Sequence, residues 1–141
     1  MKRMIITSVV LLAGIAGEAM ADCNTPPTKN LSKILSGQTV CAIKGNGDKW
    51  QEEHNKDGTL WDYKKGPNDP VDPRSKVGTW TINKTGQGTT SKEEVCYDYS
   101  SAGRYCYTLH QTGSRQYDLC TNGALDVNAT LKPISAGGCG Y

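Results

Sequence analysis

The second half of the chain alternates between apolar and polar side chains over four consecutive segments. These segments cover 94–99, 104–110, 117–120 and 125–132, and short turns containing Gly or Ser separate them. Such alternation is typical of half-buried strands connected as hairpins. The pattern therefore predicts an antiparallel meander in which tyrosine, valine and leucine side chains share one buried face.

Shorter β-prone segments precede this meander. They cover 39–43, 49–54, 59–64 and 77–84, and Asp57-Gly58 supplies a tight turn between the second and the third. A hairpin-connected sheet of this size avoids exposed edges by closing on itself. We expect an all-β fold, a single antiparallel up-and-down barrel of seven or eight strands stabilised by disulfides. A two-sheet β-sandwich is the alternative.

The N-terminal region divides into three parts. Lys2 and Arg3 precede an apolar run that is shorter than the about 20 residues of a membrane span, and small residues follow it. This order predicts a cleaved signal peptide over 1–21 and a secreted or periplasmic protein without membrane insertion. Residues 22–37 are expected to form an arm and a short helix over 31–36, and 38–141 the barrel.

The charge balance argues against nucleic acid as a partner. The full chain has 16 basic and 14 acidic residues, and removal of Lys2, Arg3 and Glu18 leaves 14 and 13. We see no basic stripe of the kind that binds a phosphate backbone. Residues 66–75 contain three prolines and are expected to form a long surface loop.

The even number of cysteines in an exported chain predicts disulfides. The six are Cys23, Cys41, Cys96, Cys106, Cys120 and Cys139. One hairpin register places Cys106 opposite Cys120, another places Cys96 opposite Cys106, and the two exclude each other. In either case an outer cysteine remains to hold an arm. The absence of a Cys-x-x-Cys pair argues against a metal site.

The chain shows no set of residues typical of catalysis, so we expect neither an enzyme nor a cofactor. His54 and His110 lie in expected strands on sides that read as polar, which predicts exposed side chains. Glu52 and Glu53 are adjacent and should point to opposite faces of a strand. Asp69 and Asp72 make only a poor calcium pattern.

Aromatic residues are the remaining chemical resource. Trp50, Trp61, Trp80, Tyr97 and Tyr107 belong to the expected strands. These side chains would either fill the core or line a cavity for a small apolar or aromatic ligand, as barrels of about eight strands allow.

Two segments resemble known families. Gly78-Thr79-Trp80 is similar to the Gly-x-Trp signature of lipocalin-like calycins, which implies a barrel that binds small apolar molecules or proteins. The loop Ser100-Ser101-Ala102-Gly103-Arg104-Tyr105 resembles the loop by which periplasmic inhibitors of C-type lysozyme enter the lysozyme cleft. These inhibitors are small disulfide-bearing barrels.

We therefore expect a non-catalytic binding or inhibitor domain that recognises a protein of the envelope or extracellular space. Loops on a rigid scaffold usually carry recognition, which points to 66–76 and 100–104. The expected contact residues are Ser100, Ser101, Gly103, Arg104 and Tyr105. A carrier of a small apolar or aromatic ligand inside the barrel is the alternative.

Overall fold

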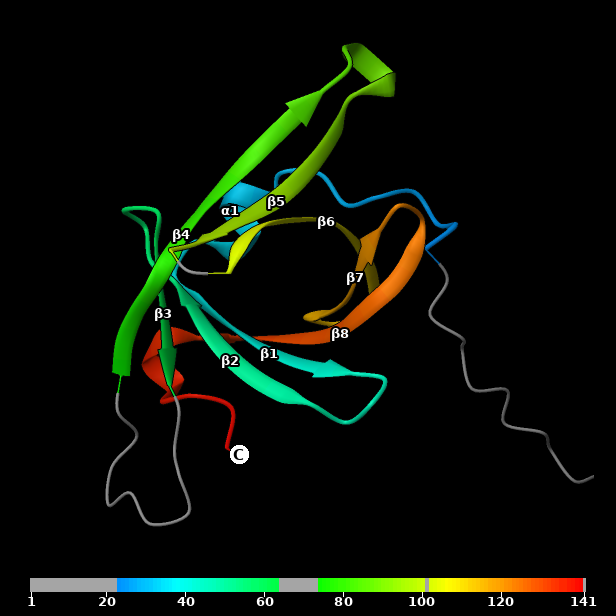
Figure 1. Ribbon diagram of the computed structural model, residues 1–141. Coiled ribbons are helices and arrows are strands. Elements are labelled where there is room, and N and C mark those ends of the chain that lie inside the picture. Colours follow the sequence, from blue (N-terminus) through cyan, green and yellow to red (C-terminus); the bar gives the residue numbers. More distant parts are fainter. Residues whose placement is uncertain (1–22, 64–73, 101, 141) are drawn as a thin grey trace, which may run out of the picture.

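The computed structural model describes residues 23–63, 74–100 and 102–140, and within them eight strands form one closed antiparallel barrel (Figure 1). Each strand pairs with the next, and the last returns to the first. The strands are β1 Gln38–Lys44, β2 Lys49–His54, β3 Thr59–Tyr63, β4 Arg74–Thr85, β5 Lys92–Tyr99, β6 Gly103–Gly113, β7 Gln116–Thr121 and β8 Ala124–Pro133. The expected up-and-down barrel is confirmed, and the sandwich alternative is wrong.

Register explains why the alternating segments close. On the seam between β1 and β8, Val40 pairs with Leu131 and Ala42 with Ala129, so apolar side chains meet on the inner face. The same face is continuous through the other strands. Its buried apolar side chains are Val40, Ala42, Leu60, Trp80, Val95, Tyr97, Leu109, Tyr117, Leu119, Val127, Ala129 and Leu131.

The short helix α1, Leu31–Leu35, closes one end of the barrel. Leu31 and Leu35 are fully buried in the core cluster, and α1 contacts β1, β4 and β5 (Figure 1). The carboxylate of Glu93 accepts a 2.8 Å hydrogen bond from the Leu31 amide, which fixes the start of the helix. Gly37 follows with φ of +75°, where a side chain would be strained. The hairpins β1–β2, β5–β6 and β7–β8 turn at the opposite, open end.

All six cysteines form disulfides, as expected. Cys96 pairs with Cys106 across β5 and β6 with their Cα atoms 4.0 Å apart. In the next hairpin Cys120 faces Thr108, so the alternative Cys106–Cys120 register is not adopted.

The two remaining disulfides hold the terminal segments. Cys23 on the N-terminal arm is bonded to Cys120, and Cys139 near the C-terminus is bonded to Cys41. Three disulfides indicate an oxidising environment, such as the periplasm or the extracellular space.

The expectation that both histidines are exposed is wrong. His54 is fully buried on the inner face, where the Tyr97 hydroxyl lies 3.0 Å from its Nε2. His110 lies on the outer face, but the N-terminal arm covers it, and its Nδ1 donates a 2.7 Å hydrogen bond to the Thr25 carbonyl. Contacts with distant segments of the chain therefore bury both histidines, and the alternation of apolar and polar residues in the sequence does not indicate such contacts.

Strand β4 begins at Arg74, three residues earlier than expected, so the end of the expected loop is strand. The hairpin β4–β5 continues past the barrel wall to the turn helix η1, Gly88–Thr90, and a second such turn, η2, covers Ile134–Ala136 (Figure 1). The expected signal peptide, the loop over 66–73 with Asp69 and Asp72, and Ser101 lie outside the described residues. Within the described part, no helix has the length and apolar character needed to cross a membrane.

Candidate functional site

The open end of the barrel contains a cavity of about 390 Å³. It lies between β2, β3, β5 and β6, on the side of the core opposite to α1. Aromatic and charged side chains line it together: Lys44, Asp48, Trp50, Glu52, Asp62, Tyr99, Tyr105 and Tyr107. Such a mixture of ring faces and a few polar groups is typical of ligand sites.

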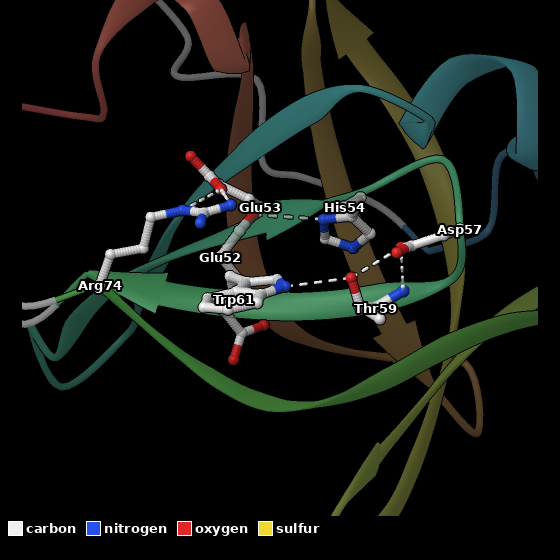
Figure 2. Close-up of polar contacts among 7 residues, drawn as sticks. All are labelled: Glu52, Glu53, His54, Asp57, Thr59, Trp61 and Arg74. Atoms are coloured by element: carbon white, nitrogen blue, oxygen red, sulfur yellow. Dashed lines mark hydrogen bonds and ion pairs between the residues drawn. The ribbon is translucent and has the colours of Figure 1, made fainter.

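Two carboxylates face each other at the wall of this cavity. Glu52 on β2 pairs in register with Asp62 on β3, which places both side chains on the inner face. Glu52 is only 7% exposed, and Asp62 is only 5% exposed. Glu53, one position further, points to the outer side of the sheet, away from the Glu52 carboxylate (Figure 2). The expectation that Glu52 and Glu53 point to opposite faces is therefore confirmed.

Tyrosine hydroxyls extend this polar layer. The Tyr99 hydroxyl lies 2.7 and 2.9 Å from the two carboxylate oxygens of Glu52 and donates to them. Burial, followed by the negative charge of Glu52, raises the pKa of Tyr99 well above its usual range. Burial and the nearby Asp126 raise the pKa of Tyr107 in the same way. Both hydroxyls therefore stay protonated and remain hydrogen-bond donors at physiological pH.

The rim of the cavity is formed by the β5–β6 hairpin and by Lys44. Tyr105 is 47% exposed, and its hydroxyl donates a 2.9 Å hydrogen bond to the Ala102 carbonyl. Arg104 forms a 2.8 Å ion pair with Asp98 across the same hairpin. On the opposite side, the Lys44 ammonium lies 5.8 Å from the centre of the Trp50 ring.

A second hollow of about 470 Å³ adjoins the first and shares Tyr105 and Tyr107 with it. It lies between the start of β6 and the β7–β8 hairpin, where the exposed Leu125 forms part of its wall. The pairing of β6 with β7 begins only at Thr108, so the first residues of β6 extend beyond their neighbour. The mouth of the barrel is therefore open towards this side as well.

The structure brings together part of each residue set expected from the sequence. Ser100, Gly103, Arg104 and Tyr105 all belong to the hairpin at the open end, next to the cavity. Ser101, the fifth expected contact residue, lies outside the described residues.

The expected ligand-binding aromatic residues separate into three places. Trp50 and Tyr107 line the cavity. Tyr97 and Trp80 lie deeper, where both rings pack against His54 with centroids 5.3 and 5.2 Å away. Trp61 is on the outer face, where the Arg74 guanidinium lies 4.3 Å from its ring centre (Figure 2). The deeper rings are thus core, and Trp61 belongs to another surface.

Sequence reasoning missed the acidic side of the cavity, formed by Asp48, Glu52 and Asp62. The signal was present in the hairpin through Asp57-Gly58, whose register sets Glu52 opposite Asp62.

The histidines and cysteines of the described residues are engaged in contacts away from the cavity. Both histidines are held in structural hydrogen bonds, and every cysteine is in a disulfide. In the described part of the chain, no group of three or more His, Cys, Asp or Glu residues is arranged to hold a metal ion. Comparisons of this chain with family models, with curated proteins and with solved structures gave no match.

Proposed function

We propose that this protein is a non-catalytic binding protein that holds a small ligand in the open end of its barrel. The observation that carries this proposal is the cavity of about 390 Å³ above a core that α1 closes from the other side. This volume falls within the range of about 300–1,000 Å³ that is usual for small-molecule sites.

The packing below the cavity determines where the ligand lies. Apolar side chains that are at most 1% exposed fill the barrel between α1 and the aromatic rings of the cavity. They are Leu60, Val95, Leu109 and Val127. A ligand would therefore contact the rings of Trp50, Tyr99 and Tyr107 at the mouth. This differs from a carrier that encloses its ligand at the centre of the barrel.

Trp50 provides a direct test, because it lines the cavity whereas Trp61 and Trp80 lie elsewhere. Native mass spectrometry of protein purified from its source should reveal a bound small molecule. Adding that molecule to the stripped protein should change the tryptophan fluorescence of the wild type and leave the Trp50→Phe variant unchanged. Protein that carries no ligand, or a fluorescence change that persists in Trp50→Phe, would contradict the proposal.

A protein partner is the second candidate, favoured by the exposure of Tyr105 at the tip of a hairpin that the Arg104–Asp98 pair stiffens. The resemblance of this loop to inhibitors of C-type lysozyme makes lysozyme the first partner to test. Inhibition by the wild type should weaken in a Ser100→Ala, Arg104→Ala variant. Thr89→Ala, an exposed change in the turn at the other end of the barrel, is the control. Equal behaviour of both variants and the wild type would exclude this candidate.

A further inference from the structure

We propose that the β5–β6 hairpin at the barrel mouth binds an extended segment of a protein partner, which joins the barrel wall as an antiparallel strand beside β6. This inference goes beyond the small-ligand site, because it concerns the edge of the wall and holds whether or not the cavity takes a ligand.

The first support is a length of β6 that has a neighbouring strand on one side only. Residues Gly103 to Tyr107 pair with β5, whereas the pairing with β7 begins at Thr108. In the described part of the chain, neither another strand nor a turn makes a backbone hydrogen bond along the other side of these residues. A closed barrel normally leaves no free strand edge. The first residues of β6 are therefore an exception in the wall, where a further strand can be added.

The second support is the direction of the backbone groups at this edge. In an antiparallel pair, hydrogen-bonded residues alternate with more closely spaced residues whose N–H and C=O groups point away from the paired strand. Cys96 and Cys106 face each other with Cα atoms only 4.0 Å apart, so Cys106 is of the second kind, and Arg104 shares its direction. Each of these two residues of β6 directs one donor and one acceptor towards the free side. An extended peptide backbone matches groups with this spacing.

The third support is the room beside the edge. The hollow of about 470 Å³ separates these residues from the β7–β8 hairpin. Arg104 and Tyr105 are exposed, and Cys106 is half-buried, so the edge is accessible. In an added strand, the side chain opposite Tyr105 would lie on the same face as the Tyr105 ring. The exposed Leu125 in the wall of the hollow offers further apolar surface to such a side chain.

The fourth support is that the edge is rigid and unprotected. The Cys96–Cys106 disulfide and the 2.8 Å ion pair between Arg104 and Asp98 hold this part of β6 against β5. An edge that is formed in advance loses less conformational freedom when a partner binds. Exposed edges are often protected by proline or lysine, and residues 103–107 contain neither. The hairpin is therefore ready to accept a strand.

Hydrogen exchange in the free protein tests the direction of the backbone groups. The alternation directs the Tyr105 amide towards β5 and the amides of Arg104 and Cys106 towards the free side. We expect the amides of Arg104 and Cys106 to exchange at least about tenfold faster than the Tyr105 amide. Equal protection of the three amides would overturn the free edge and the inference with it.

Three peptides with the same side chains then test binding to the isotope-labelled wild-type protein by nuclear magnetic resonance. They are acetyl-Ser-Thr-Val-Thr-Ser-amide, the same peptide N-methylated at both threonines, and the same peptide N-methylated at valine. With valine opposite Tyr105, the threonine amides face β6 and the valine amide faces away from it. The unmodified peptide should shift the amide signals of Arg104 and Cys106. Methylation of the threonines should weaken binding at least about tenfold, and methylation of valine should have little effect.

A bulky side chain in the hollow should compete with the added strand. Ala124 is exposed and lines the hollow from β8, so Ala124→Trp should weaken binding of the unmodified peptide at least about fivefold. Thr89→Trp is the matched control, because it adds the same ring at the exposed turn beyond the other end of the barrel. It should leave the affinity unchanged. The amide spectrum of each variant verifies that the barrel is folded.

The outcomes decide between a partner strand and its alternatives. Equal binding of the two methylated peptides would show that the peptide backbone does not make the contact, and would overturn the inference. No binding of the unmodified peptide at millimolar concentration would overturn it as well. Shifts of the same amides that depend on protein concentration, without any peptide, would assign the edge to a second copy of this chain. The small-ligand site is tested separately through Trp50, so either proposal can fail without the other.

Discussion

The imidazole of His54 and the hydroxyl of Tyr97 form a 3.0 Å hydrogen bond inside the barrel. The Nδ1 atom of His54 donates to the Glu52 carbonyl at 3.2 Å, so Nε2 accepts from Tyr97 (Figure 2 shows the contact with Glu52). Burial lowers the pKa of His54 to about 4, against a usual value of 6.5. The folded barrel therefore holds this histidine neutral.

The burial of His54 predicts a loss of stability in mild acid. Below a pH of about 6.5 the unfolded chain binds a proton at His54, whereas the folded chain does not bind this proton until about pH 4. The free energy of unfolding should therefore fall as the pH drops through this window, by about 3 kcal/mol from this group. Urea unfolding of the wild type and of His54→Gln at several pH values measures the effect. The variant should lose less stability between pH 6.5 and 4, and identical slopes would refute the assignment.

The strands β4 and β5 approach so closely at Gly78 that no space is left for a methyl group. A Cβ atom at this residue would lie 2.1 Å from the Asp98 carbonyl oxygen on β5. We expect Gly78→Ala to lower the free energy of unfolding by about 2–4 kcal/mol, since the two strands would have to separate. Gly45→Ala is the control, because nothing lies within 4 Å of its added Cβ, and it should change stability by less than about 0.5 kcal/mol. Equal effects in thermal or urea unfolding would contradict the close approach.

The three disulfides should contribute unequally to stability. Cys96–Cys106 joins residues 10 positions apart within one hairpin, whereas Cys41–Cys139 spans 98 positions. A longer closed loop restricts the unfolded chain more, so replacing Cys41 and Cys139 by serine should cost about 1–2 kcal/mol more than replacing the hairpin pair. Urea unfolding of the two double variants under oxidising conditions provides the comparison. The reverse order would mean that loop length does not govern these bonds.

On the outer face, Arg74 and Glu53 form an ion pair with a buried carboxylate, which should contribute more to stability than an exposed pair. Arg74 Nε and Nη2 lie 2.8 and 2.6 Å from the same Glu53 oxygen, and the Glu53 side chain is 1% exposed (Figure 2). A double-mutant cycle with Glu53→Gln and Arg74→Gln should give a coupling of about 1–3 kcal/mol, because the Glu53 carboxylate is buried and its attraction to Arg74 is little screened by solvent.

The pair of Arg104 and Asp98 is the matched control for this cycle. Its side chains are 52% and 42% exposed, so the same measurement should give less than about 1 kcal/mol. A larger coupling at this exposed pair than at Glu53 and Arg74 would contradict the role of burial.

The alternation of apolar and polar residues was sufficient to predict the barrel, because successive side chains of a strand point to opposite faces of the sheet. Tyr97, Leu109, Leu119 and Val127 all point inward as expected, and the register of the β5–β6 hairpin places Cys96 opposite Cys106. These features depend on near neighbours in the sequence. Local pattern and turn chemistry are enough to predict which side chains face inward, but they leave two hairpin registers open for the cysteines.

The cavity depends on information of another kind. Trp80 and Trp50 look alike in the sequence, but their height along the barrel axis decides that Trp80 packs near α1 and Trp50 lines the mouth. His54 was expected to be exposed because the pattern does not show that Tyr97 lies within hydrogen-bond distance of it. Depth within a barrel and the cover supplied by distant segments arise from the closed fold and have no local signature.

The disulfides of the two terminal segments determine how the chain responds to tension. Cys23 is bonded to Cys120, and Cys139 to Cys41, so both ends are fastened to the wall of the molecule. An unfolding motor that pulls on either terminal segment would extend only a short stretch of chain before the force reaches a disulfide bond. Stretching the protein by atomic force microscopy should therefore extend the chain by a few nanometres at most. Full extension should require a reductant that breaks the disulfides.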